Sequence, residues 1–380
     1  MARRISRQRA LQIAQWQKAR ITNKFIADNR KTEERLARRV RGGGHKSIYV
    51  INRNYRGGSW RYLTDIMAKY NHLDYIFINS AKQLQGIRFT EGDTLVIQYL
   101  MNSDITVSKL VEIVEKYKLR VIIPMHDWYW CTKDQTFSTL TQDSVFCHMA
   151  YLRSDLTVRP AVRHLFDQAK IIIAPSHFLS EGYKRIFQKD LNVTVVPHND
   201  YPVRSSKLYI PKIINGQINI GVFMRQEPCK GAEILMHLVK GVRSHRGYGI
   251  NYCMVGKTIP RYKESGFYEH ARKYNIHCFL YLNKWGETYC YALTRAIAMG
   301  TPIFYNNIGA FRERLGDKEW HFQNTQSEAN YPDVSGTVSR LGRCLDYVIK
   351  KQGTGRFPSD LSNTIKYHPF YNDLFGGRED

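Results

Sequence analysis

Short apolar runs alternate with helical stretches along most of this chain, and this alternation is what most restricts its fold. The runs are mostly apolar, and helical stretches such as 108–117 and 176–187 separate them. Continuous apolar strands joined by helical crossovers are typical of a parallel sheet covered by helices on both faces. We therefore predict an α/β fold. The expected strands lie at 48–51, 75–78, 94–99, 121–124, 171–174, 193–196, 218–224, 252–255, 277–282 and 302–305.

A stretch without clear periodicity, 202–217, separates the first six expected strands from the last four. A chain of 380 residues is long enough for two domains of ordinary size. We predict four parts: a basic helical extension (1–45), an N-terminal Rossmann-like domain (46–205), a C-terminal Rossmann-like domain (206–357) and a tail (358–380).

The stretch 285–315 reads as a loop–helix–turn–strand–loop unit. Glu287 lies on a Gly-Glu-Thr turn before the helix, and Gly309 lies on a second turn after the strand. The first N–H groups of a helix are unpaired and the dipole is positive there, so this end attracts phosphate. A carboxylate in that place is better suited to sugar hydroxyls. The N–H groups of Thr288 and Tyr289, with those of the Gly309 turn as a further donor contact, complete what the unit indicates, a nucleotide-sugar site. The alternative is that Glu287 only complements the helix dipole.

The sequence ETYCYAL at 287–293 resembles the motif ETYxYxL of a bacterial and viral subgroup of the family-4 glycosyltransferases, which have the GT-B fold. Arg225 and Lys230 stand five residues apart after an expected strand, like the family's element that holds the donor diphosphate. The alternative is a pair of exposed cations. The resemblance implies two doubly wound domains facing a cleft, 46–205 for the acceptor and 206–357 for the donor. It also implies retention of the anomeric configuration.

Two residue pairs in the first half of the chain extend the resemblance. His126 and Asp127 follow the expected strand 121–124, and the carboxyl ends of strands are where open α/β sheets bind ligands. By resemblance His126 faces the donor sugar, and Asp127 orients it or contacts the acceptor; a structural His-Asp pair is the alternative. Gly57 and Gly58 resemble the family's glycine-rich turn and let the backbone approach the diphosphate.

One residue departs from the family's pattern. The family carries Glu-x7-Glu, in which the second Glu contacts the donor ribose, and this chain has Arg295 there. An Arg cannot accept hydrogen bonds from hydroxyls. Arg295 is therefore predicted to contact a phosphate or Glu287, or else to be an exposed helix residue. A donor with a 2′-deoxyribose, such as a dTDP-sugar, would lose the fewest hydrogen bonds where the second Glu is replaced.

No Asp-x-Asp pair occurs in the chain. A divalent metal on the donor phosphates needs carboxylate ligands, whereas Arg and Lys neutralise a diphosphate directly. We expect no metal and no cofactor, with the nucleotide-sugar as a substrate.

The net charge of +24 is more than a diphosphate substrate uses. Residues 1–41 hold thirteen Lys and Arg against three Asp and Glu, with apolar residues between them. This extension is predicted to be helical and to contact the protein body or an anionic membrane, with nucleic acid as the less favoured partner. Apolar residues at helical spacing in 361–375 predict a tail helix that crosses back to the first domain, as in the family, or lies on the surface.

The chain has no run of about eighteen apolar residues. Its N-terminus has no secretory pattern, and its seven cysteines are dispersed. These features predict a cytoplasmic protein, with peripheral membrane contact as the further expectation.

The leading prediction is a retaining, metal-independent hexosyl- or deoxyhexosyltransferase. It would move a sugar from a nucleotide-sugar donor to a glycan or lipid-linked acceptor in surface or capsid glycan synthesis. The net charge motivates a second hypothesis, a glycosyltransferase that modifies nucleic acid. Arg295 motivates a third, an inactive protein that binds a nucleotide-sugar or glycan.

Overall fold

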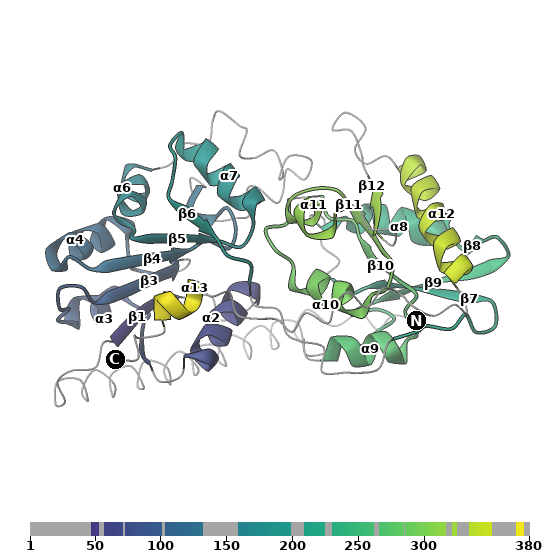
Figure 1. The fold of residues 1–380 in the computed structure, drawn as a ribbon, viewed down its shortest axis with the longest axis horizontal. Helices are drawn as coiled ribbons and strands as arrows, with labels where there is room; N and C mark the ends of the chain where they lie inside the picture. The colour runs from purple at the N-terminus through teal and green to yellow at the C-terminus, as the bar shows by residue number, and fades with distance from the viewer. Residues whose placement is uncertain are drawn as a thin grey trace, which may run out of the picture. The chain divides into compact units, whose positions relative to one another are not determined.

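Two six-stranded sheets with helices on their faces make up the part of the chain that the structure describes (Figure 1). The structure is a computed structural model. It describes residues 47–52, 57–70, 73–100, 103–131, 159–198, 209–224, 230–261, 266–284, 286–316, 321–324, 334–351 and 370–375.

The first sheet has the strand order β2-β1-β3-β4-β5-β6. Strand β1 pairs in parallel with β2 and β3, and β3 pairs in parallel with β4. The strands are β1 (Ser47–Asn52), β2 (Asp74–Ile78), β3 (Thr94–Tyr99), β4 (Arg120–Pro124), β5 (Ile171–Ala174) and β6 (Val193–Val195). The helices that accompany them are α2 (Gly57–Lys69), α3 (Ala81–Gly86), α4 (Val107–Tyr117), the 3-10 helix η1 (Tyr129–Cys131), α6 (Pro160–Gln168) and α7 (His177–Phe187).

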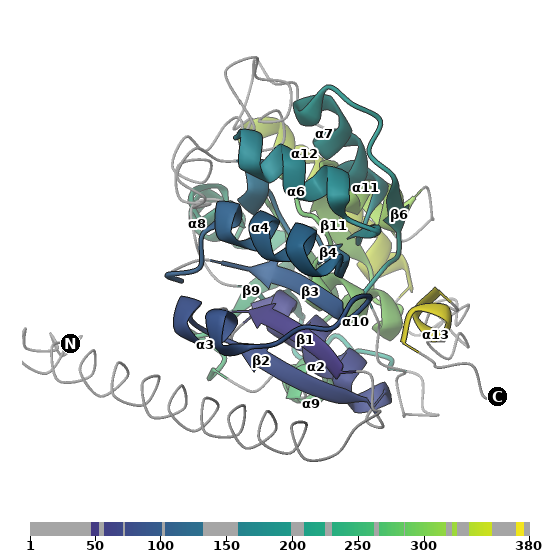
Figure 2. The same ribbon diagram turned by 90° about the vertical axis from the view of Figure 1, so that its left-hand side faces the viewer.

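Local sequence signals explain where two of these helices begin and end. Thr106 accepts a hydrogen bond from the backbone N–H of Lys109 (3.2 Å) and so caps the start of α4, which ends at Lys118 in the left-handed conformation. Ser176 caps α7 in the same way. Helices α4 and α6 pack side by side (Figure 2). Strands β3 and β4 are buried on both faces, which is why their central residues are apolar.

The second sheet has the order β12-β11-β10-β7-β9-β8. Strands β7, β9, β10, β11 and β12 pair in parallel, and β8 is an antiparallel edge strand. The strands are β7 (Gln217–Val222), β8 (Ser244–His245), β9 (Tyr248–Met254), β10 (Cys278–Tyr281), β11 (Ile303–Asn306) and β12 (His321–Asn324). The helices are α8 (Ala232–Gly241), α9 (Phe267–Lys273), α10 (Tyr291–Met299), α11 (Ala310–Leu315) and α12 (Val334–Lys351), and α13 (Phe370–Phe375) follows near the C-terminus.

Two apolar cores lie on the two faces of the second sheet. Alternate residues of β7, such as Ile218 and Ile220, pack with α8 and α12 on one face. Phe279 and Tyr281 of β10 point to the other face and pack with α9, α10 and α11. Helices α9 and α10 lie on one side of the sheet and α8 and α12 on the other (Figure 1). The α/β fold with doubly wound sheets is therefore confirmed.

The chain divides into two compact units, Met1–Pro124 with Pro160–Ile172, and Met125–Arg159 with Ile173–Asp380. The second unit contains η1, α7 and β6 as well as the whole second sheet. All strands of the first sheet fall within 46–205 and all strands of the second within 206–357. The predicted domain boundaries themselves stay predictions.

The extension 1–45 and much of the tail 358–380 lie outside the described residues. Within the tail the described residues form α13, inside the expected helix at 361–375. None of the helices among the described residues is long and apolar enough to cross a lipid bilayer.

Candidate functional site

The loops after β7, β10 and β11 bring three of the predicted site residues together in the second unit. Lys230 follows β7 and precedes α8, Glu287 follows β10, and Gly309 follows β11. The three strands are parallel neighbours, with β10 between the other two. Their carboxyl ends therefore meet at one edge of the sheet, where open α/β sheets bind ligands.

Glu287 is a buried carboxylate with two partners. Its side chain is 7% exposed, and it forms an ion pair with the Lys230 ammonium group, which is 19% exposed. The Nδ2 group of Asn283 donates a hydrogen bond to Oε1 of Glu287 at 2.5 Å. A buried carboxylate needs such partners because removing a charge from water is costly. The interpretation of Lys230 as an exposed surface cation is wrong, since its ammonium group is held by this carboxylate.

Gly309 fits tightly against the turn that carries Glu287. Its φ is +60°, and a Cβ atom added there would lie 2.6 Å from the backbone nitrogen of Glu287 and 2.6 Å from Cα of Gly286. The next residue, Ala310, donates its N–H to the carbonyl oxygen of Glu287 at 2.7 Å. Only glycine permits this approach, so the loop after β11 fixes the backbone of the Glu287 turn.

The loop after β10 also contacts the start of α8. Gly231, at φ +76°, lies so close to Leu282 that a Cβ atom would come within 2.0 Å of the Leu282 carbonyl oxygen. The buried Lys284 side chain pairs with Glu233, in the first turn of α8, at 2.5 Å. These two contacts place Lys230, the residue before Gly231, beside the Glu287 turn.

The hydroxyl groups of Thr288 and Tyr289 donate hydrogen bonds to backbone carbonyl oxygens within the second unit. Thr288 Oγ1 donates to the carbonyl oxygen of His126 at 2.5 Å, and the Tyr289 hydroxyl donates to the carbonyl oxygen of His198 at 2.6 Å. Both side chains are buried. Their predicted contribution to a ligand through backbone N–H groups stays a prediction.

Arg314, on α11, is a site residue that the sequence analysis missed. Its guanidinium group donates to the carbonyl oxygens of Tyr289 (2.5 Å) and Cys290 (3.0 Å) and to Oγ1 of Thr294 (2.5 Å). It also lies 4.1 Å from the centre of the Tyr289 ring. Cys290 precedes α10 with a φ of +70°, which is unfavourable for a residue with a side chain. Arg314 therefore holds the strained turn at the start of α10.

His126 lies directly after β4 and faces a second histidine. Its Nδ1 is 3.4 Å from Nε2 of His198, a residue that the sequence analysis also missed. His198 in turn stacks on Tyr291, with ring centres 5.5 Å apart and an interplanar angle of 11°. The ring of His126 keeps partial exposure, yet the surrounding protein desolvates it and lowers its pKa to about 3. At neutral pH His126 is thus an uncharged imidazole.

Asp127 has a local structural contact. Its Oδ1 accepts a hydrogen bond from the backbone N–H of Tyr129 at 2.9 Å, which caps the start of η1. The backbone carbonyl of Asp127 accepts a hydrogen bond from the Tyr183 hydroxyl at 2.8 Å. Its predicted contact with an acceptor or with His126 stays a prediction.

The remaining predicted site residues are Arg295, Gly57, Gly58 and Arg225. Arg295 lies on α10 and is 7% exposed, so the interpretation that it is an exposed helix residue is wrong. Gly57 and Gly58 begin α2 in the first unit, and Gly58 is exposed. Arg225 lies outside the described residues.

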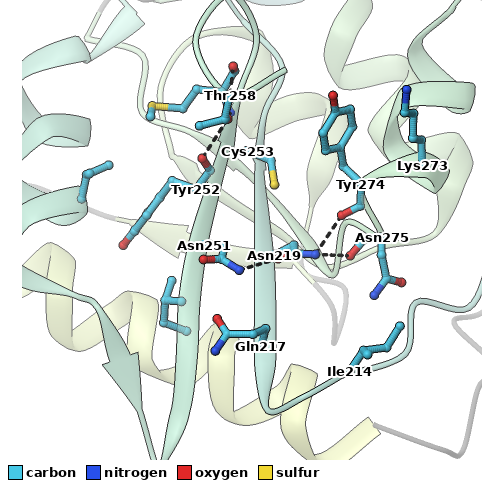
Figure 3. Close-up of a pocket in the computed structure, with 13 residues that line it drawn as sticks. Ile214, Gln217, Asn219, Asn251, Tyr252, Cys253, Thr258, Lys273, Tyr274 and Asn275 are labelled. Atoms are coloured by element: carbon cyan, nitrogen blue, oxygen red, sulfur yellow. Dashed lines mark hydrogen bonds between the residues drawn. The ribbon is translucent and has the colours of Figure 1, made fainter. Parts of the chain in front are cut away.

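A separate cavity of about 640 Å³ is lined by residues of β7 and β9 and by the turn after α9 (Figure 3). Asn219 points into it and donates to the carbonyl oxygens of Tyr274 (2.8 Å) and Asn275 (3.3 Å), and Asn251 donates to Asn219 (3.2 Å) (Figure 3). Both polar atoms of the Asn219 side chain thus have partners within the protein. Within the described ranges no group of three or more His, Cys, Asp and Glu side chains is arranged to hold a metal ion; metal independence stays a prediction.

The low pKa of His126 predicts a dependence of stability on pH. Its pKa is about 3 in the folded chain against an ordinary 6.5, so the unfolded chain binds more protons between these values. The free energy of unfolding should therefore rise with pH across this window and stop rising above pH 6.5. His126→Gln should reduce this slope by at most about 1.4 kcal/mol per pH unit. Urea unfolding from pH 4 to pH 7 measures this slope. An unchanged slope in His126→Gln would contradict the prediction.

Comparison with solved structures identifies the architecture. No family model matches the chain, and no curated protein matches it by sequence. Sucrose-phosphate synthase from Thermosynechococcus elongatus aligns over 87% of this chain and 97% of its own, with a TM-score of 0.56 and 11% identity. HepE from Anabaena, solved in complex with UDP and glucose, aligns over 81% and 96% with a TM-score of 0.53 and 12% identity. The chain has the GT-B fold.

A third GT-B structure, the lipopolysaccharide outer core galactosyltransferase WaaB in its apo form, aligns over 87% of this chain and 99% of its own. Its TM-score is 0.52 and its identity 10%. In all three comparisons the alignment covers almost the whole length of the other chain. The predicted GT-B architecture is therefore confirmed at the level of the fold.

Proposed function

We propose that this chain is a glycosyltransferase that moves a sugar from a nucleotide-sugar donor to a glycan or lipid-linked acceptor. The observation that carries the proposal is the Lys230–Glu287 pair at the carboxyl ends of β7 and β10 in a GT-B fold. Two states of HepE, solved with UDP-glucose and with UDP and glucose, support a nucleotide-sugar as the class of donor.

The ion pair suggests how a donor would be received. Lys230 and Glu287 neutralise each other in the structure. A diphosphate would take Lys230 as its counter-ion, and the sugar hydroxyls would donate hydrogen bonds to Glu287. Each member of the pair thus gains a new partner when the donor binds, so that neither charge is left buried alone.

The proposed reaction needs no group beyond the donor and the acceptor. The bond between C1 of the sugar and the diphosphate oxygen breaks, and the acceptor oxygen bonds to C1 on the same face. The acceptor's proton passes to the departing diphosphate. Lys230 and Arg225 stabilise the charge that develops on the diphosphate, and the N–H groups of Thr288 and Tyr289 assist them. Neutral His126 orients the donor sugar.

The proposal also specifies the nucleotide of the donor. Arg295 cannot accept hydrogen bonds from ribose hydroxyls, so a 2′-deoxyribose donor such as a dTDP-sugar loses least there. We expect a dTDP-sugar to be turned over faster than the matching UDP-sugar. Equal turnover of the two would overturn this assignment.

The net charge of +24 favours a second candidate, a glycosyltransferase that acts on nucleic acid. Such an enzyme would bind a DNA duplex with an affinity that falls steeply as salt rises, because counter-ions are released on binding. Salt-independent or undetectable binding would remove this candidate.

A thermal-shift experiment without added metal tests the proposed function. Nucleoside diphosphates and sugar nucleotides with uridine, thymidine, guanosine and adenosine are offered to the wild type, Arg225→Ala and Glu287→Ala. A ligand at 100 times its Kd stabilises the folded chain by about 2.7 kcal/mol, which raises Tm measurably. We expect selective stabilisation by one sugar nucleotide and its loss in both variants. No shift with any nucleotide would overturn the proposal.

A further inference from the structure

Three buried asparagines stand at the carboxyl ends of neighbouring parallel strands in the second sheet. Asn306 is the last residue of β11 and Asn324 the last of β12, and the two are paired in register. Asn283 follows β10 by two residues. Their exposed fractions are 0% for Asn283, 2% for Asn306 and 1% for Asn324.

Hydrogen bonds join the three residues into one chain. Asn324 Nδ2 donates to Oδ1 of Asn306 at 2.6 Å, and Asn306 Nδ2 donates to the backbone carbonyl oxygen of Asn283 at 2.9 Å. Asn283 Nδ2 then donates to Oε1 of Glu287 at 2.5 Å. The chain of hydrogen bonds therefore ends on the carboxylate that we assign to the donor sugar.

Helix α12 anchors the other end. Arg340 Nε donates to Oδ1 of Asn324 at 2.6 Å. The hydroxyl group of Thr337, on the same helix and fully buried, lies 3.2 Å from Nδ2 of Asn324. Arg340 is half-buried, so the network runs from an accessible side chain on α12 to a buried carboxylate after β10.

The order of donors and acceptors gives the network a direction. Arg340 can only donate, so it requires an oxygen from Asn324, which turns the Nδ2 of Asn324 toward Asn306. The Oδ1 of Asn306 accepts there, and its Nδ2 is directed to the carbonyl of Asn283. At the far end Glu287, ionised, can only accept, and it fixes the Nδ2 of Asn283. The amides of Asn306 and Asn324 each have one low-energy orientation, because reversing either one turns donor to donor or acceptor to acceptor and leaves buried groups unpaired.

We propose that Asn306, Asn324 and Arg340 are positioning residues that hold Asn283, and through it Glu287, in the orientation that receives the donor sugar. The inference rests on the proposed function. Apolar side chains would fill the same strand ends without buried amides, so packing alone does not call for this network. A carboxylate that discriminates hydroxyl positions must be held to about 0.5 Å, and neighbouring hydrogen bonds provide that restraint.

Isothermal titration separates positioning from a general structural role. The sugar nucleotide that stabilises the wild type best, and the nucleoside diphosphate that corresponds to it, are titrated into the wild type and Arg340→Ala. We expect the Kd of the sugar nucleotide to rise about ten-fold, or about 1.4 kcal/mol, because Glu287 contacts only the sugar. The Kd of the nucleoside diphosphate should stay within a factor of about two. Arg343→Ala, an exposed position on the same helix, is the matched control and should change neither.

A double-mutant cycle tests the route through Glu287. In a Glu287→Gln background, Arg340→Ala should cause no further loss of sugar-nucleotide affinity. Asn306→Leu keeps the size of the side chain and removes the network at its centre, so it should repeat the selective loss. Since Asn306 is buried and this variant can fail to fold, the Arg340 cycle decides the question in that event.

The outcomes distinguish the inference from the proposed function. If the wild type binds no sugar nucleotide, the proposed function falls and the inference falls with it. If the wild type binds one, and Arg340→Ala weakens the sugar nucleotide and the diphosphate equally or weakens neither, only the inference is overturned. A loss that persists undiminished in the Glu287→Gln background overturns it as well.

Discussion

Replacing Lys230 with Ala is expected to lower kcat for sugar transfer by about 100- to 1,000-fold. Negative charge develops on the diphosphate as the bond to the sugar breaks, and a preorganised cation stabilises that charge more than it stabilises the bound donor. Lys230 is mostly buried, so water screens its charge little. The loss should therefore appear in kcat as well as in kcat/KM.

The same substitution also removes the counter-ion of buried Glu287, so stability must be measured beside activity. A buried carboxylate that loses its partner can cost about 3–5 kcal/mol. Lys230→Ala combined with Glu287→Ala removes both charges and should recover much of that stability without recovering kcat. Lys240→Ala, an exposed position at the far end of α8, is the matched control and should retain full kcat. A Lys230→Ala enzyme that is folded and as active as the wild type would rule out the assigned role.

The strands that the sequence predicts best are those buried on both faces. The expected strands 94–99 and 171–174 coincide with β3 and β5, because a continuous apolar run ends where the sheet ends. Strand β12 reads His-Phe-Gln-Asn and lies at the edge of its sheet, so its polar residues give no apolar run. Strand β8 has two residues and pairs only with β9, which leaves no periodicity to detect.

The residues of the site also differ in whether the sequence could predict their proximity. The proximity of Lys230 and Glu287 could be predicted because both follow strands of one parallel sheet, where position in the sequence implies position in space. Arg314 and His198 could not, since their contacts with the Tyr289 turn join residues far apart in the chain without a local pattern. The asparagine network has the same character. Asn283 and Asn306 follow expected strands, but Asn324 ends a strand that the sequence does not indicate, and only the register of β11 and β12 shows that Asn306 and Asn324 meet.

Gly231→Ala is expected to lower the free energy of unfolding by several kcal/mol and to abolish donor binding. At φ +76° the backbone alone costs about 1–2 kcal/mol for a residue with a Cβ. The added atom would also lie 2.0 Å from the carbonyl oxygen of Leu282, which is backbone and cannot turn aside. The start of α8 and the loop after β10 must therefore separate, and that movement takes Lys230 away from Glu287.

Gly247→Ala measures the cost of the left-handed backbone alone, without a steric clash. Gly247 has a similar φ, +84°, but no heavy atom lies within 4 Å of an added Cβ. It should lose only about 1–2 kcal/mol, the cost of the left-handed conformation, and keep donor affinity. Urea unfolding of both variants measures the difference, which represents the clash with Leu282. Equal losses in the two variants would mean that α8 and the loop after β10 can separate at little cost, and that the position of Lys230 does not depend on their close packing.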